Sequence, residues 1–160
     1  MRFVICTVGH RAPAWVSAGF EDYARRMPRE TPVQLIEVRA ERRPSKAPSA
    51  AQIVKLVAAE AARIRLALPG GCAVVALDEA GRSFTSIQFA RRLEGFRREG
   101  RDVAFVIGGA DGLEQGLKQS ASLLLSLSAL TLPHQLVRVL LVEQLYRGVS
   151  LLHHHPYHRE

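Results

Sequence analysis

Five short apolar runs, each followed by a longer stretch, constrain the fold of this sequence more than any other feature. The runs span residues 2–8, 32–38, 72–78, 102–109 and 122–128. Each has the length of a strand, and all but the second are almost continuously apolar. Strands that alternate with helices, and that are apolar on both faces, predict a mostly parallel α/β sheet with helices on both faces.

The stretches between these runs carry helix signals. Helices are expected over 13–27, 49–68, 85–100, 110–121 and 134–152. Ser49 with Gln52, and Thr85 with Gln88, have the spacing of capping boxes, in which the two side chains satisfy free backbone amides. Residues 39–50 are rich in arginine, proline and serine and predict a flexible basic loop.

Length and composition favour one soluble domain over residues 1–160, of which 48% are hydrophobic. The net charge of +7 favours an anionic partner, of which nucleic acid is the commonest, although a solvated basic surface is the alternative. Cys6 and Cys72 lie in strand-like runs, which indicates small buried side chains in a reducing compartment. No run has the ~20 apolar residues of a membrane span, and no signal peptide is evident, so a cytoplasmic location is expected.

A ligand site is expected where three predicted strands end, since open α/β sheets bind ligands outside their carboxyl ends. These ends are residues 76–81, 106–112 and 125–133. Glycines 108, 109 and 112 allow a backbone to approach a ligand closely, or simply form a tight turn. Residues 126–134 are small and apolar and would suit an adenine or methionine moiety, or form a packed loop. No phosphate-binding P-loop is present, and the glycines match the dinucleotide-binding pattern only in part.

Five segments carry a resemblance to a known family. They read VGHRAPAWVSAGFEDYARR, LDEAGRSFTSIQFA, GRDVAFVIGGADGL, LSLSALTLPHQLVRVLLVEQLYR and HPYHRE. The sequence resembles the ribosomal RNA large subunit methyltransferase H family, small members of the SPOUT methyltransferases, along nearly its whole length.

The resemblance implies a SPOUT-type fold in which a deep trefoil knot involves roughly residues 103–160. It also implies a homodimer that binds S-adenosylmethionine in the knot and methylates N3 of a pseudouridine in 23S ribosomal RNA on the assembled ribosome. DNA and membranes are not expected as partners. A ribosome-binding factor that uses the same scaffold without catalysis is the alternative.

Positions that match the family motifs imply the cofactor contacts. These are Leu77, Asp78, Gly108, Gly109, Ser128, Ala129, Leu130, Thr131, Leu132 and Pro133. They fall at the three strand ends identified above.

Methyl transfer to a ring nitrogen needs alignment of the acceptor and removal of the N3 proton. His155 and His158 of the tail are possible bases, and His158 is placed ahead of His134. Arg159 is a candidate phosphate-binding or charge-stabilising group, and Tyr157 a candidate for stacking on the target base. Arg138 follows His134 by one helical turn and is either catalytic or a structural ion-pair partner. A zinc site built from the tail histidines is the less favoured alternative, and no metal is expected.

The tail LLHHHPYHRE differs from the commonest family form at one position. His154 stands where most members have asparagine, so the role of that position is open. The tail is expected to fold over the cofactor pocket of its own subunit or of its partner. Candidate RNA contacts are Arg25, Arg26, Arg29, Arg42, Arg43, Lys46, Arg91, Arg92, Arg97 and Arg98.

Overall fold

A five-stranded sheet forms the centre of the molecule. The computed structural model describes residues 1–9 and 12–158, the last of them by its backbone alone. The strands are β1 (Phe3–Val8), β2 (Val33–Val38), β3 (Ala73–Ser83), β4 (Val103–Ile107) and β5 (Leu123–Ser126). Their order in the sheet is β2-β1-β4-β3-β5, and every pair is parallel. The predicted parallel α/β sheet is therefore confirmed.

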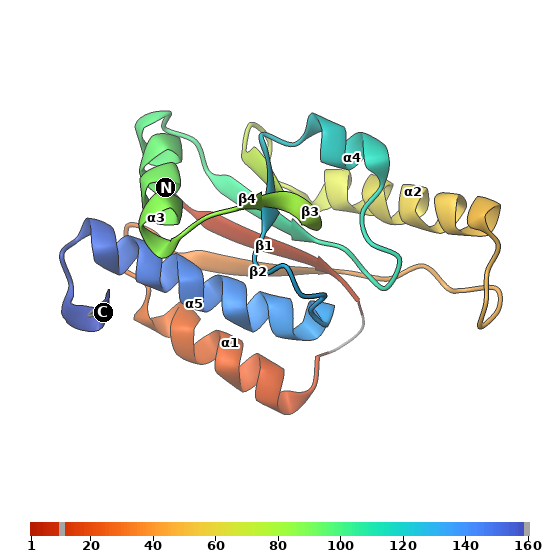
Figure 1. Cartoon of the computed structure of the whole chain (residues 1–160), viewed down its shortest axis with the longest axis horizontal. Coiled ribbons are helices and arrows are strands. Elements are labelled where there is room, and N and C mark those ends of the chain that lie inside the picture. The colour runs from red at the N-terminus through yellow and green to blue at the C-terminus, as the bar shows by residue number, and fades with distance from the viewer. Residues whose placement is uncertain (10–11, 159–160) are drawn as a thin grey trace.

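Helices cover both faces of this sheet (Figure 1). They are α1 (Ala14–Arg26), α2 (Ala50–Ala67), α3 (Ser86–Arg98), α4 (Gln115–Ser120) and α5 (His134–Leu152), followed by a 3-10 turn, η1 (Pro156–His158). Figure 1 shows α1 and α5 on one side of the sheet and α2 and α4 on the other. None of the helices within the described ranges is long and apolar enough to cross a bilayer.

The core consists of two apolar clusters, one on each face of the sheet, because successive side chains of a strand point to opposite faces. Phe3 and Ile5 of β1 belong to the cluster that includes Phe20 of α1, Leu93 of α3 and Leu141 of α5. The second cluster contains Cys6 and Val8 of β1, Ala61 and Ile64 of α2, and Leu117 of α4. Cys6 is buried as expected, whereas Cys72 is only half-buried; both are free thiols.

Capping residues set where three helices begin. Both predicted capping boxes are present, Ser49 with Gln52 at α2 and Thr85 with Gln88 at α3. The expected helix over 110–121 begins only at Gln115, because the Glu114 carboxylate accepts a hydrogen bond from Leu117 N and caps it. The residues before Glu114 form a glycine turn instead of helix.

Strand β3 runs five residues past its predicted end at Asp78. The pairing with β5 shifts in register between Leu77 and Arg82, and both of these residues pair with Leu125. Gly81 makes this return possible, since a Cβ built there would lie 2.6 Å from the Leu125 carbonyl carbon. The backbone of residues 77–83 therefore closes against β5, and residues 78–80 project at the carboxyl edge of the sheet.

Helix α5 spans the predicted residues 134–152 and ends in a Schellman motif. His155 N donates to Ser150 O at 2.9 Å, and His154 N donates to Leu151 O at 3.3 Å. His154 has a φ of 54°, the only positive φ of a non-glycine residue in the described ranges. This left-handed residue turns the chain back, so that η1 packs on α5.

Candidate functional site

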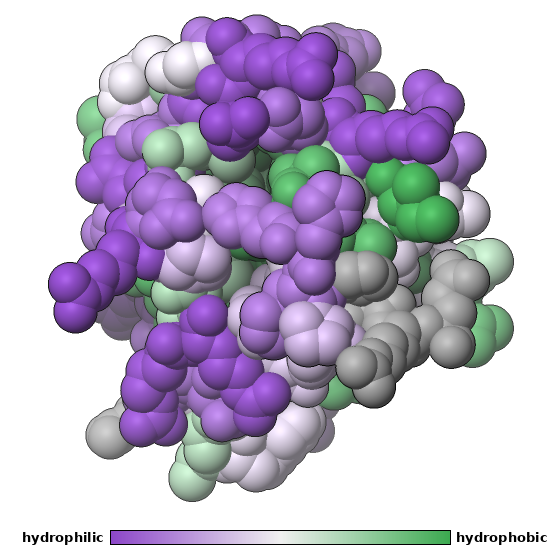
Figure 2. Space-filling view, turned by 90° about the vertical axis from the view of Figure 1, so that its left-hand side faces the viewer, coloured by the Kyte–Doolittle hydropathy of each residue, from purple (hydrophilic) through white to green (hydrophobic). Residues whose placement is uncertain are grey.

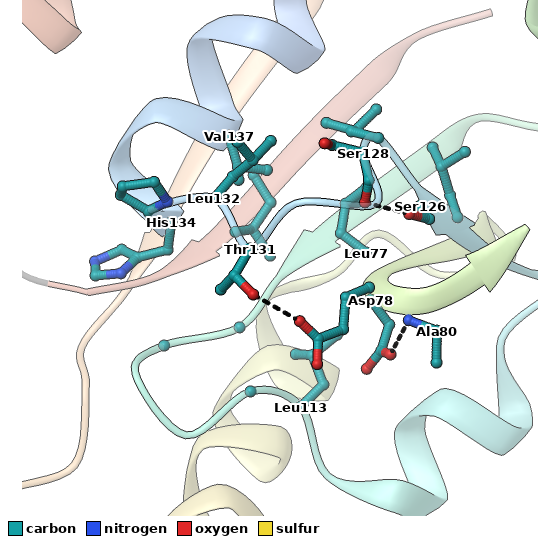
Figure 3. Close-up of a pocket in the computed structure, with 18 of the residues that line it drawn as sticks. Leu77, Asp78, Ala80, Leu113, Ser126, Ser128, Thr131, Leu132, His134 and Val137 are labelled. Atoms are coloured by element: carbon teal, nitrogen blue, oxygen red, sulfur yellow. Dashed lines mark hydrogen bonds between the residues drawn. The ribbon is translucent and has the colours of Figure 1, made fainter. Parts of the chain in front are cut away.

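A cavity of about 640 Å³ lies at the carboxyl ends of β3, β4 and β5 (Figure 3). Three segments supply most of its lining: 77–80, 107–113 and 125–134 without Ala129. Nine of the ten expected cofactor contacts line it, namely Leu77, Asp78, Gly108, Gly109, Ser128, Leu130, Thr131, Leu132 and Pro133. Ala129 belongs to the same loop but does not line the cavity. The fold therefore brings together three strand ends that lie far apart in the sequence.

The glycine turn between β4 and α4 is tightly folded. A Cβ at Gly108 would lie 2.6 Å from the carbonyl carbon and oxygen of Gly112, so position 108 admits no side chain without distortion. Gly112 N donates to Gly109 O at 3.1 Å, and Gly112 has a φ of 76°, which favours glycine. The tight-turn interpretation is confirmed, and the same turn lines the cavity with bare backbone, so close approach to a ligand stays a prediction.

The loop between β5 and α5 forms the opposite wall. Ser126 Oγ donates to Ser128 O at 2.9 Å, and Leu130 N donates to Ser128 Oγ at 2.9 Å, so the side chains shape the loop locally (Figure 3). Leu130 remains 74% exposed at the cavity.

Charged side chains that the sequence did not mark as site residues also line the cavity. Lys118 of α4 forms an ion pair with Asp78 at 3.0 Å, and Asp78 also accepts a hydrogen bond from Ala80 N. Partial burial acts to raise the pKa of Asp78, but the Ala80 N–H and the Lys118 ammonium hold this pKa below its ordinary value. Glu79 accepts a hydrogen bond from Thr131 Oγ1 at 3.1 Å, joining two walls (Figure 3). No sequence pattern pairs Lys118 with Asp78, although Lys118 lies on the helix that follows the glycine turn.

His134 and Arg138 occupy different environments at the start of α5. His134 lines the cavity, and burial, together with the nearby Arg138 charge, lowers the pKa of its imidazole. Arg138 does not line the cavity; it is 1% exposed and forms an ion pair with Glu37 of β2 at 2.8 Å. Its Nε and Nη2 have no partner among the described residues. Of the two roles expected for Arg138, the geometry favours the structural one.

The tail lies at the other end of α5 (Figure 1). The Tyr157 ring packs on Tyr146 with centroids 4.7 Å apart, and its hydroxyl donates to Glu143 at 3.2 Å. Burial and the neighbouring Tyr23 and Glu143 raise the pKa of Tyr157. Glu143 and Tyr146, which this cluster contacts, lie about 14 and 18 Å along the α5 axis from His134, and Tyr157 does not line the cavity. The described part of the tail therefore does not cover the cavity of its own chain, while the His158 side chain and Arg159 lie outside the described residues.

Figure 2 faces this end of the molecule, where most visible side chains are hydrophilic. His154 serves there as the left-handed residue of the helix cap. Asparagine adopts this conformation more readily than other non-glycine residues. Among the described residues, no group of three His, Cys, Asp or Glu side chains is placed to hold a metal ion.

The candidate RNA-binding arginines lie on separate parts of the surface, and several form ion pairs. Arg97 and Arg98 both bind Glu94, which lowers the pKa of that carboxyl to about 2. Arg26 binds Asp22, and Arg43 binds Asp111. Arg42 and Arg91 are exposed. These pairings reduce the local positive charge without removing the outer N–H groups as phosphate donors.

Comparisons with known proteins extend along the whole chain. A family model described as a predicted SPOUT methyltransferase matches residues 1–158. The chain is similar to proteins called ribosomal RNA large subunit methyltransferase H, with 50% identity to that of Nitrosospira multiformis and 52% to that of Ralstonia pickettii. Each match covers 99% of both proteins.

Solved structures show a similar fold at low sequence identity. A probable methylase family protein from Haemophilus influenzae Rd KW20 has a TM-score of 0.52 and 16% identity, covering 99% of this chain and 70% of that one. A putative methylase family protein from Neisseria gonorrhoeae has a TM-score of 0.50 and 14% identity, covering 91% and 81%.

Proposed function

Since this chain belongs to the ribosomal RNA large subunit methyltransferase H family of SPOUT methyltransferases, we propose that it methylates large-subunit ribosomal RNA with S-adenosylmethionine as the donor. The proposed acceptor is N3 of a pseudouridine in 23S rRNA, on the assembled ribosome in the cytoplasm. The observation that carries this proposal is the cavity at three strand ends, whose walls contain nine of the ten residues expected to contact the cofactor.

The cavity fits this cofactor in size and in lining. Its volume of about 640 Å³ lies in the range of small-molecule sites. Leu77, Leu132 and Val137 provide apolar surface, and the turn at Gly108 offers a backbone that no side chain covers. When bound, the cofactor supplies a methyl group on a positively charged sulfur. The carboxylates of Asp78, Glu79 and Asp111 along the same walls are compatible with a cationic ligand.

The protein must align the ring nitrogen and remove its proton. His134 lines the cavity, and its lowered pKa keeps the imidazole neutral at neutral pH, so that it can accept a proton. His158 is the alternative base, with Arg159 as the stabilising cation and Tyr157 as the stacking group. Tyr157 packs on Glu143 and Tyr146, about 14 Å or more along α5 from His134, so in this conformation one chain does not bring both side chains to the same base.

We infer that the active enzyme is a homodimer in which the tail of one subunit reaches the cavity of the other. Trp15 of α1, 60% exposed, and Leu140 of α5 offer apolar surface on neighbouring helices for such contact. One domain over 1–160, with a trefoil knot involving residues 103–160, is part of this proposal. The close approach of Gly81 to the Leu125 backbone supports the knot, because it brings residues 77–83 against β5.

Methyl transfer to ribosomes tests the proposal. Purified protein is incubated with labelled S-adenosylmethionine and ribosomes that lack the modification, and the modified nucleotide is then identified by mass spectrometry. The expected product is N3-methylpseudouridine in 23S rRNA, whereas ribosomes that already carry the modification should take up no label. Ribosome binding without label would support the non-catalytic alternative.

A further inference from the structure

Two segments that are far apart in the sequence meet beside the cavity. One is the basic segment 39–43, which follows β2, and the other is the glycine turn 108–112, which follows β4. Arg43 binds the Asp111 carboxylate with two donors, Nη2 to Oδ1 at 2.5 Å and Nε to Oδ2 at 3.2 Å. Asp111 lines the cavity with a side chain that is 16% exposed. A bidentate pair of this kind fixes orientation as well as distance.

The segment that carries Arg43 is itself anchored on α2. Arg63 donates to Arg39 O at 3.0 Å and forms an ion pair with Glu41. Glu60 is 8% exposed, and its Oε1 accepts a hydrogen bond from Glu41 N at 2.8 Å. The Arg43 guanidinium therefore reaches the glycine turn from a backbone that α2 holds in place.

The glycine turn has no comparable anchor of its own. Within it, Gly112 N donates to Gly109 O, and the two glycines form an isolated bridge. Among the described hydrogen bonds and ion pairs, the Arg43–Asp111 contact alone joins a side chain of residues 108–112 to another segment. Glycine-rich backbone has many accessible conformations, so a single external contact restricts it strongly.

We propose that Arg43 is a positioning residue for the cofactor site, because it holds Asp111 and thereby fixes the backbone of the turn 108–112 that faces the cofactor. This inference rests on the proposed function. It differs from a direct electrostatic role in which the Asp111 carboxylate attracts the sulfonium and Arg43 merely weakens that attraction. For Arg43→Gln the two roles predict opposite changes in the Kd of S-adenosylmethionine.

S-Adenosylmethionine and S-adenosylhomocysteine separate these roles, since only the first carries the sulfonium charge. Both ligands are titrated by calorimetry into the full-length protein and into Arg43→Gln, Asp111→Asn and the double variant. Positioning predicts that each single change raises the Kd of both ligands by the same factor, about three- to tenfold. The double variant should be no weaker than either single one.

Arg42→Gln is the matched control, because Arg42 is the exposed neighbour of Arg43 and its side chain makes no ion pair among the described residues. Its Kd values should stay within about twofold of the unaltered protein. Thermal unfolding checks that each variant folds. The charge-swapped pair Arg43→Asp with Asp111→Arg, which restores an ion pair, should regain affinity relative to Arg43→Asp alone.

The positioning role is overturned if Arg43→Gln binds S-adenosylmethionine, but not S-adenosylhomocysteine, more tightly while Asp111→Asn binds S-adenosylmethionine more weakly. That pair of results would indicate direct attraction of the sulfonium by Asp111. Unchanged affinity in both single variants would overturn the positioning role as well. Failure of the unaltered protein to bind either ligand is a separate result that would remove the proposed function, and this inference with it.

Discussion

The two ends of α5 differ in nearly every property that matters for chemistry. The N-terminal end carries His134 beside a cavity built from small residues and bare glycine backbone. The C-terminal half carries Tyr146, Glu143 and Arg147, on which the tail packs. These three residues lie about 14 to 20 Å along the helix axis from His134. In a single subunit the proposed cofactor cavity and the proposed catalytic groups of the tail therefore lie at different places along α5.

Protonation also differs between the two ends. At the N-terminal end, burial and Arg138 lower the pKa of His134, which favours a neutral acceptor of protons. At the C-terminal end, burial raises the pKa of Tyr157, so its hydroxyl stays protonated and donates to Glu143. Each end is organised separately, which is why we propose that the two meet between subunits.

Truncation after Leu152 should have the largest effect. Removal of residues 153–160 deletes Tyr157, His158 and Arg159 but leaves the cavity intact, so methyl transfer should fall by more than ~100-fold while the cofactor Kd stays within about threefold. Transfer to unmodified ribosomes and calorimetry measure the two quantities. Full activity of the truncated protein would show that the tail takes no part in catalysis.

Gly108→Ala should disturb only the cavity beside the N-terminal end of α5. Its methyl group would lie 2.6 Å from the Gly112 carbonyl, so the turn must distort, and the cofactor Kd should rise at least ~10-fold. Gly95→Ala in α3 is the control, since beyond the neighbouring residues and backbone of its own helix no atom lies within 4 Å of the new Cβ. This control should bind normally and unfold with about 0.5–1 kcal/mol more stability.

Mixing the truncated protein with Gly108→Ala tests whether the tail of one subunit reaches the cavity of the other. A heterodimer of the truncated chain and Gly108→Ala has one intact cavity facing one intact tail, so activity should return to about a quarter of the unaltered level. The quarter follows from random exchange, in which half of the dimers are mixed and each has one working site of two. No recovery, despite subunit exchange shown by mass spectrometry, would contradict the shared site.

His134 should make stability depend on pH below its ordinary pKa. Because folding lowers this pKa from 6.5, the unfolded chain binds the proton more tightly. The neutral His134 imidazole therefore makes its full contribution to the free energy of unfolding above pH 6.5, and this contribution is lost as the pH falls through the lowered pKa. Thermal unfolding between pH 5 and 7.5 should show a shallower slope for His134→Gln than for the unaltered protein. Equal slopes would place the titrating group elsewhere.

His154→Asn should have the smallest effect and a favourable one. The left-handed backbone at His154 suits asparagine better, so the free energy of unfolding should rise by about 0.5 kcal/mol. Chemical denaturation measures the change. His153→Asn is the control, since His153 has a φ of −97° and should gain nothing. Equal stabilisation by both changes would indicate a cause other than the backbone.

Local patterns in the sequence determined the elements and their order. Apolar runs located five strands, capping boxes located the starts of α2 and α3, and helical spacing located α5 from His134 to Leu152. The general rule for parallel sheets then indicated the three strand ends that form the cavity. These features depend on residues that are close in the sequence, so their spacing predicts them without a structure.

Contacts between residues that are far apart in the sequence were decided only by the tertiary structure. It extended β3 because Gly81 can approach Leu125, buried Arg138 against Glu37, and joined Arg43 to Asp111 across 68 positions of sequence. It also placed Tyr157 against Glu143 and Tyr146 of α5, outside the cavity that His134 lines. Sequence periodicity specifies which face of an element is apolar, but ion pairs and separations arise only when the packed elements fix all residues in space.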